Sequence, residues 1–79
     1  MQTRLKILTP EKVIVDKPVD HVGLESVSGS LGVLPEHTPL AAMLKKSLVT
    51  YTAGGVQESV EIKGGFARIL PNSVTVFTE

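Results

Sequence analysis

The stretch that decides the fold runs from Leu48 to Lys63 and reads LVTYTAGGVQESVEIK. In its first half, alternate residues form two faces, and one face consists of Val49, Tyr51 and Ala53. An alternation of period two is typical of a β-strand that buries one face. Gly54-Gly55 then marks a two-residue turn, because glycine reaches the positive φ angles that tight hairpins need. The stretch therefore predicts two antiparallel strands joined by a tight hairpin.

The second strand of this hairpin carries one exception to the alternation. Its apolar face consists of Val56, Val60 and Ile62, and its other face is polar. The spacing places Glu58 on the apolar face, where a carboxylate without a partner is costly to bury. We therefore expect Glu58 to lie near a strand end or a bulge.

Short apolar runs bounded by turn residues recur through the rest of the chain. They occupy residues 5–8, 13–15, 22–27, 66–70 and 74–77. Turn signals such as Gly64-Gly65 come every eight to twelve residues, a spacing typical of a β-sandwich or barrel. The pattern predicts an all-β fold in which residues 1–79 form a single domain.

One segment, from Thr38 to Lys46, is ambiguous. Thr38 as an N-cap, Pro39 at the first helical position and the closing lysines all favour a helix. The segment is nevertheless short for a helix that must stand without other support. From the residues alone, a helical turn and an extended segment both remain open.

The loop from Gly29 to Leu40, which reads GSLGVLPEHTPL, predicts the functional edge of the domain. It holds two glycines and two prolines, which impose backbone angles that other residues rarely adopt. Large aliphatic residues lie between these breakers, so the loop is both shaped and partly anchored. Apolar side chains exposed on a rigid loop are a usual means of docking on another protein.

Composition excludes several classes of function. Eight basic and eight acidic residues give no net charge, and the three aromatic residues are too few for a base-stacking surface, so nucleic acid is not an expected partner. The absence of cysteine excludes disulfides and thiolate metal sites. The sequence contains neither a signal-peptide apolar block near Met1 nor a membrane-spanning apolar run, so we expect a soluble, cytosolic chain without membrane insertion.

The residues that could support catalysis or metal binding form weak patterns. His21 and His37 are the two histidines, with Glu36 beside the latter and Ser28 and Ser30 in the nearby loop. No nucleophile-elbow motif accompanies them, and two histidines sixteen residues apart make a poor metal signal. The paired glycines lack the Lys-Ser/Thr ending of a phosphate-binding loop. We therefore expect no catalytic residue, no metal and no cofactor.

Four motifs together resemble a known family. They are Leu5–Glu11, the loop from Gly29 to Leu40, Gly64–Ile69 and Asn72–Phe77, which occur in this order across nearly the whole chain. The chain is similar to the N-terminal β-sandwich domain of the epsilon subunit of F-type ATP synthases. The resemblance implies ten strands in two five-stranded sheets, and it implies that Leu40–Leu44 is mostly extended.

The resemblance also implies a function and a set of contacts. It implies a non-catalytic subunit in the rotor's central stalk, on the cytoplasmic face of the bacterial plasma membrane, that helps couple proton flow to ATP synthesis. The implied partners are the gamma subunit and the polar loops of the membrane c-ring. The c-ring contacts map to Ser30, Leu31 and Gly32. The gamma contacts map to Thr9, His37 and Ala42.

Two departures from the family limit what is carried over. Many relatives have an acidic residue where this chain has Ser30, so contact with the c-ring is expected to rest on Leu31 and the loop backbone. Leu31 as a core residue is the competing reading. Relatives usually continue into two C-terminal helices, whereas this chain stops at Glu79, so ATP binding and inhibition are not expected of it. The main alternative function is a free-standing small β-barrel that binds a ligand.

Overall fold

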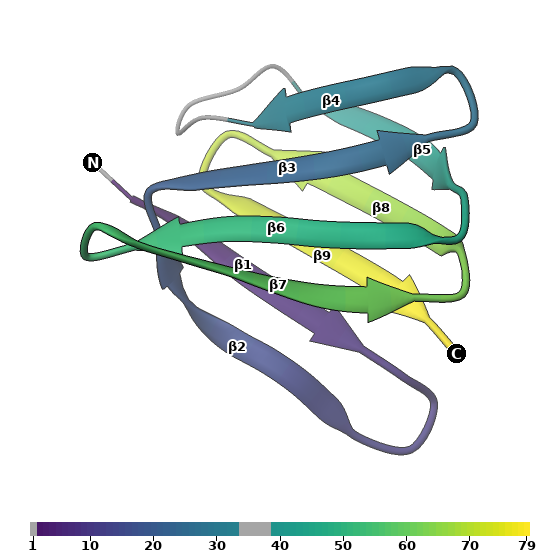
Figure 1. Ribbon diagram of the computed structural model, residues 1–79, viewed down its shortest axis with the longest axis horizontal. Coiled ribbons are helices and arrows are strands. Elements are labelled where there is room, and N and C mark those ends of the chain that lie inside the picture. Colours follow the sequence, from purple (N-terminus) through teal and green to yellow (C-terminus); the bar gives the residue numbers. More distant parts are fainter. Residues whose placement is uncertain (1, 34–38) are drawn as a thin grey trace.

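A computed structural model describes residues 2–33 and 39–79, and every regular element among them is a β-strand. The nine strands are β1 Thr3–Leu8, β2 Val13–Val19, β3 His21–Ser26, β4 Gly29–Val33, β5 Leu40–Leu44, β6 Ser47–Ala53, β7 Val56–Ile62, β8 Gly65–Leu70 and β9 Ser73–Thr78. The predicted all-β class is thus confirmed. Figure 1 shows the strands stacked as a curled sheet.

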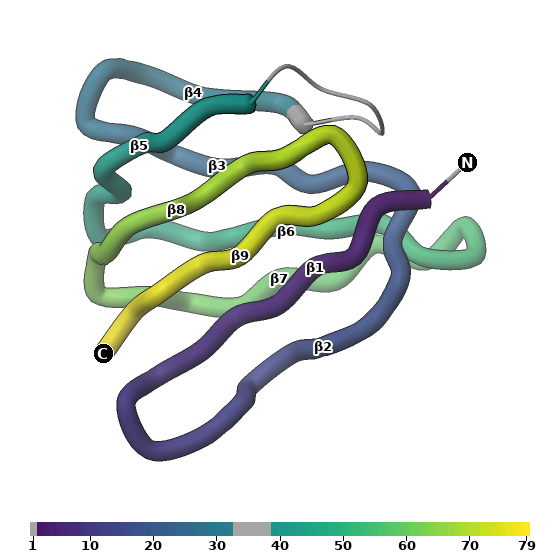
Figure 2. The backbone as a smooth tube through the Cα atoms, turned by 180° about the vertical axis from the view of Figure 1, so that it is seen from behind, coloured from purple at the N-terminus to yellow at the C-terminus, as the bar shows by residue number. Residues whose placement is uncertain are grey.

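The hydrogen-bonded sheet divides into two halves. The order β2-β1-β9-β8-β5 forms a five-stranded half, which Figure 2 shows as one layer, and β4-β3-β6-β7 forms a four-stranded half. A single pairing, Ser26 with Leu44, joins them between β3 and β5. The two layers match the predicted sandwich, but the described residues hold nine strands where ten were expected. Within the described residues β4 pairs with β3 alone, so the four-stranded half ends there.

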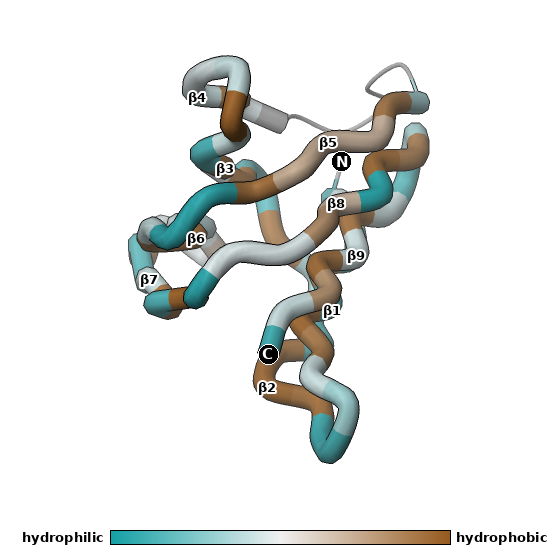
Figure 3. The backbone as a smooth tube through the Cα atoms, turned by 90° about the vertical axis from the view of Figure 1, so that its right-hand side faces the viewer, coloured by the Kyte–Doolittle hydropathy of each residue, from teal (hydrophilic) through white to brown (hydrophobic). Residues whose placement is uncertain are grey.

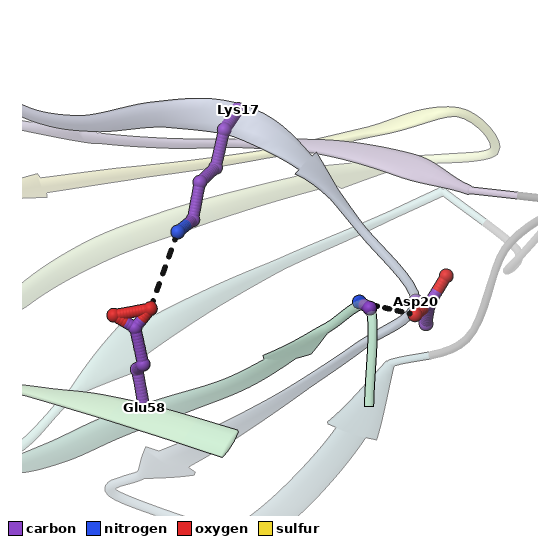
Figure 4. A network of polar contacts seen from close by, with 4 residues as sticks. Lys17, Asp20 and Glu58 are labelled. Carbon is purple, nitrogen blue, oxygen red and sulfur yellow. Dashed lines mark hydrogen bonds and ion pairs between the residues drawn. The ribbon is translucent and has the colours of Figure 1, made fainter. Parts of the chain in front are cut away.

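The chain crosses between the two halves at Asp20, the one residue between β2 and β3. The Asp20 amide donates a hydrogen bond to the carbonyl of Thr52 at 2.7 Å. Its carboxylate oxygen Oδ2 accepts one from the Gly54 amide at 3.3 Å, as Figure 4 shows. These two bonds tie the corner to the β6–β7 hairpin, which fixes how the halves face each other.

The core fills the space between the halves. Its buried side chains come from both layers and include Leu5, Ile7, Val15, Val19, Val22, Leu24, Leu44, Val49, Tyr51, Ile62, Ala67, Ile69, Val74 and Val76. In β6 the buried positions are Val49 and Tyr51, the face that the alternation predicts. Full burial of each large aliphatic side chain is worth about 1.5–3 kcal/mol, so this core is the main source of stability.

The structure decides two of the local predictions. The glycine hairpin is confirmed, because Gly54 and Gly55 have φ angles of 60° and 80°. The helix signals around Pro39 did not prevail, since Leu40–Leu44 forms β5 and pairs along its whole length with β8, as the resemblance implies. Non-local hydrogen bonds and burial outweigh the weak local preference of so short a segment.

The prediction for Glu58 is confirmed for the face, and of the two positions offered, a strand end or a bulge, the bulge is absent. Glu58 pairs with buried Tyr51 in register, as the third residue of an unbulged β7. Its carboxylate reaches across the gap between the layers to the Lys17 ammonium, 3.3 Å away (Figure 4). That ammonium also lies 5.1 Å from the centre of the Tyr51 ring. The carboxylate is tolerated on this face because its side chain is 46% exposed at the open edge of the sandwich and has a charged partner there.

Candidate docking surfaces

An apolar row crosses the outer face of the five-stranded half. It consists of Met43, Phe66, Phe77, Leu8 and Val13, one residue from each strand, and neighbouring members are partners in the strand register. Met43 is 58%, Phe66 38% and Phe77 46% exposed. The two phenylalanine rings lie 6.5 Å apart between centroids. An open hollow of about 590 Å³ lies along the end of the row formed by Met43, Phe66 and Phe77.

The row arises because the strand period turns large apolar residues outward. In β8 the residues Ala67 and Ile69 are buried, so Phe66 and Arg68 face outward. In β9 the same alternation turns Phe77 outward. Figure 3 shows hydrophobic segments recurring through β5, β1 and β2 of this half. A contiguous exposed apolar surface of this kind marks an interaction site more often than isolated exposed residues do.

Charged residues lie beside the apolar row. Lys6 and Arg68 both pair in register with Thr75, two residues along the strands from the row and on the same face, and both are exposed. Further along, the Arg4 guanidinium donates to the Asp16 carboxylate at 2.7 Å. That hydrogen bond is the main cause that lowers the pKa of Asp16 below its ordinary value. The surface therefore combines an apolar row with a mostly basic flank.

The predicted gamma contacts are placed at separate points of this half. Thr9 directly follows Leu8, and its hydroxyl oxygen accepts hydrogen bonds from the amides of Glu11 and Lys12, so it holds the turn. Ala42 adjoins Met43 but pairs with buried Ala67, so its side chain points inward. His37 lies outside the described residues. The apolar row spans the distance between Thr9 and the strand that carries Ala42, and the gamma contacts themselves stay a prediction.

The predicted c-ring contacts divide between two faces of β4. Ser30 and Gly32 are exposed on the outer face of the four-stranded half. Leu31 points the other way, pairs with buried Leu24 and packs against the core while partly exposed. Leu31 and Ala42 line the same hollow, of about 270 Å³, between β4 and β5. The packing supports the reading of Leu31 as a core residue, and its contact with the c-ring stays a prediction.

Sequence reasoning missed the apolar row as a surface, although one signal was present. Phe66 shares its strand phase with Arg68, and Phe77 shares its phase with Thr75, whereas the opposite phases hold the apolar pairs Ala67–Ile69 and Val74–Val76. The alternation alone could have predicted that each ring lies on the outer face of its strand. What it could not supply is the register that aligns residues from five strands, because strand pairing is not local in sequence.

The residues considered for chemistry do not converge in the described part of the chain. His21 is exposed at the start of β3, Ser28 lies in the β3–β4 turn and Ser30 lies in β4. Glu36 lies outside the described residues, as does His37. Residues 2–33 and 39–79 contain no group of three metal-ligating side chains. The same ranges contain no helix able to cross a membrane.

Comparison with known proteins shows which family the chain belongs to. The model of the family described as "ATP synthase, Delta/Epsilon chain, beta-sandwich domain" matches residues 2–79. The chain belongs to this family. The epsilon chain of ATP synthase from Herpetosiphon aurantiacus is 39% identical over 79 residues, and that from Alkalihalophilus pseudofirmus is 38% identical over 76. The matches cover 100% and 96% of this chain but 58% and 57% of those relatives, so the chain spans little more than half their length.

Chains in two solved ATP synthase structures have the same fold as this chain. A chain in the mitochondrial ATP synthase of Euglena gracilis, solved with OSCP, F1 and the c-ring, superposes with a TM-score of 0.91 at 25% identity. The match covers 98% of this chain and 50% of that one. A chain from the central stalk and c-ring of the Tetrahymena thermophila enzyme gives a TM-score of 0.79 at 12% identity, covering 99% and 63%, and shows the fold alone. The delta/epsilon β-sandwich family is therefore confirmed by sequence and by structure.

Proposed function

We propose that this chain is a central-stalk subunit of an F-type ATP synthase, where it docks on gamma and on the c-ring and helps couple proton flow to ATP synthesis. The observation that carries the proposal is the superposition on a chain of a solved ATP synthase, with a TM-score of 0.91 over 98% of this chain. In this role the chain makes no bond itself. It transmits torque through rigid contacts, and the catalysis belongs to other subunits.

The two exposed faces of the sandwich suit two partners. We assign the face with the apolar row, bounded by Thr9 and the Ala42 strand, to gamma, because exposed aromatic rings are effective anchors when a partner covers them. We assign the β3–β4 end, with Ser30, Leu31 and Gly32, to the polar loops of the c-ring. In this arrangement residues 1–79 act as one β-sandwich domain, peripheral to the membrane on the cytoplasmic face of the plasma membrane.

The alternative of a free-standing ligand-binding barrel has less support. Such a barrel needs room between its layers for a ligand. Here the interior is occupied by side chains from both halves, and Leu5, Ile7 and Val22 are fully buried. The hollows along the described residues include the outer ones beside the apolar row and beside Ser30.

Co-purification tests the proposal directly. The chain, tagged at its C-terminus, is co-expressed with gamma and the c subunit of the same synthase, and membranes are extracted in mild detergent. The proposal expects gamma and the c-ring to elute with the tagged chain in one complex. Elution of the tagged chain alone as a monomer, while gamma and the c-ring assemble without it, would overturn the proposal and favour the free-standing domain.

A further inference from the structure

A groove of about 400 Å³ lies on the outer face of the four-stranded half, beside the proposed c-ring contacts. Its lining includes Gly23, Glu25, Ser30, Leu48 and Thr50. These residues come from three adjacent strands, β3, β4 and β6. The groove is therefore formed by regular strands, whose positions the sheet register holds.

Two glycines face each other on the outer face of β3 and β4, beside this groove. Gly23 and Gly32 are register partners on β3 and β4. A Cβ on Gly23 would lie 2.5 Å from Oγ1 of Thr50, so the threonine side chain lies across that glycine. A Cβ on Gly32 would meet only Nε2 of His21, at 3.5 Å. The two glycines therefore give the Thr50 and His21 side chains room to lie against the sheet.

Glu25 supplies the charge on the wall of this groove. It lies directly opposite Ser30 in the strand register, and because Leu24 and Ser26 are buried, the Glu25 side chain points outward. The two ion pairs within the described residues involve other groups, Arg4–Asp16 and Lys17–Glu58. No lysine, arginine or histidine lines the groove. The Glu25 carboxylate is therefore without a cationic partner among the described residues.

Other charged groups lie on the strand next to the groove and at the strand ends. Glu61 of β7 pairs in register with Leu48, so it adds a second carboxylate just outside the groove. Lys45 contributes its backbone amide, which donates to the Glu25 carbonyl at 3.2 Å. Lys46 and Lys63 lie beyond the ends of β6 and β7. The groove wall thus carries carboxylates, with the lysines at the strand ends and the His21 imidazole beside Gly32.

The groove has the chemistry to hold one long cationic side chain. Leu48, 51% exposed, offers an apolar wall for the methylene stem of a lysine or arginine. Glu25 accepts a charge-assisted hydrogen bond from the cationic head, and the Ser30 hydroxyl offers a further acceptor beside it.

We propose that Glu25 is the acidic contact of the c-ring interface, receiving a lysine or arginine from a polar loop of the ring in the groove between β4 and β6. This contact rests on the proposed function, and it gives that interface a charged residue that the mapped positions Ser30, Leu31 and Gly32 lack. Because Glu25 and Ser30 face each other, a carboxylate at either position reaches the same groove.

The test moves the negative charge of the groove from Glu25 to the facing position 30 and measures how the c-ring binds. The chain bound to gamma is titrated with detergent-solubilised c-ring of the same synthase, and affinity is measured at several salt concentrations. Glu25→Gln is expected to weaken binding about fivefold and to flatten the salt dependence, since a solvent-accessible ion pair has an effect of this size. Adding Ser30→Glu to that variant is expected to restore affinity to about the parent value, because the carboxylate returns to the groove from the facing strand.

Matched controls separate this contact from general effects. Glu61→Gln removes the same charge from just outside the groove and is expected to weaken binding much less than Glu25→Gln does, and the melting temperature of each variant reports whether the fold is intact. Unchanged affinity of a folded Glu25→Gln variant would overturn the contact while leaving the proposed function standing. So would failure of Ser30→Glu to restore binding. If the parent chain does not bind the c-ring at all, the proposed function falls and this contact falls with it.

Discussion

Replacing Phe77 by threonine tests whether the apolar row is a docking surface. Phe77 sits at the centre of the row, in register with Phe66 on one side and Leu8 on the other. Threonine is β-branched and, like phenylalanine, favours strands, but it removes the ring. The matched control is Val56→Thr, because Val56 is 59% exposed and lies at the β6–β7 hairpin of the other half. Both variants exchange an exposed apolar residue for the same polar one.

The expected loss of gamma binding follows from the exposed fraction of the ring. Complete burial of a phenylalanine side chain is worth about 1.5–3 kcal/mol. The ring is 46% exposed in the isolated chain, so docking can bury a little under half of it, worth about 1 kcal/mol. That free energy corresponds to about a fivefold increase in Kd. The buried remainder packs within the domain, so the melting temperature should also fall, by about 4–8 °C for each kcal/mol lost.

Calorimetric titration with gamma and a thermal melt measure the two effects separately. Val56→Thr is expected to bind gamma as the parent does. If Phe77→Thr also binds with the parent affinity, the apolar row is not the gamma surface. If both variants weaken binding equally, the effect is not specific to the row, and the reasoning from register is wrong.

Three further predictions follow from individual contacts. The lowered pKa of Asp16 means that its pairing stabilises the fold above the ordinary carboxyl value of 3.8 and that this contribution is lost as pH falls through the lowered pKa. In a pH titration by NMR, Arg4→Gln should therefore raise the Asp16 pKa, and an unchanged value would refute the pairing. Lys17→Met should cost at most about 1 kcal/mol, since the pair with Glu58 is partly solvated, and a double-mutant cycle with Glu58→Gln should show a coupling of that size. Leu31→Asp should lower the melting temperature by about 5 °C or more because the leucine packs against the core, and a parent-like melt would contradict that packing.

The sequence by itself determined the features that depend on neighbouring residues. Alternation along residues 48–53 predicted the buried face of β6, because side chains of a strand point to opposite sides whatever it pairs with. Gly54-Gly55 predicted the hairpin because the turn needs positive φ at those two positions. The order of the four family motifs predicted the β-sandwich family, which the match to residues 2–79 confirms.

The tertiary structure decided what depends on pairing between distant segments. Leu40–Leu44 is a strand because β8 supplies its hydrogen bonds, which outweigh the local helix signals. Glu58 can face inward because Lys17, forty-one residues away, reaches it across the layers. The apolar row and the pairing of Glu25 with Ser30 likewise exist only through strand register. Register is set by burial and hydrogen bonding over the whole sheet, and a shift of one residue would turn each of these side chains to the opposite face.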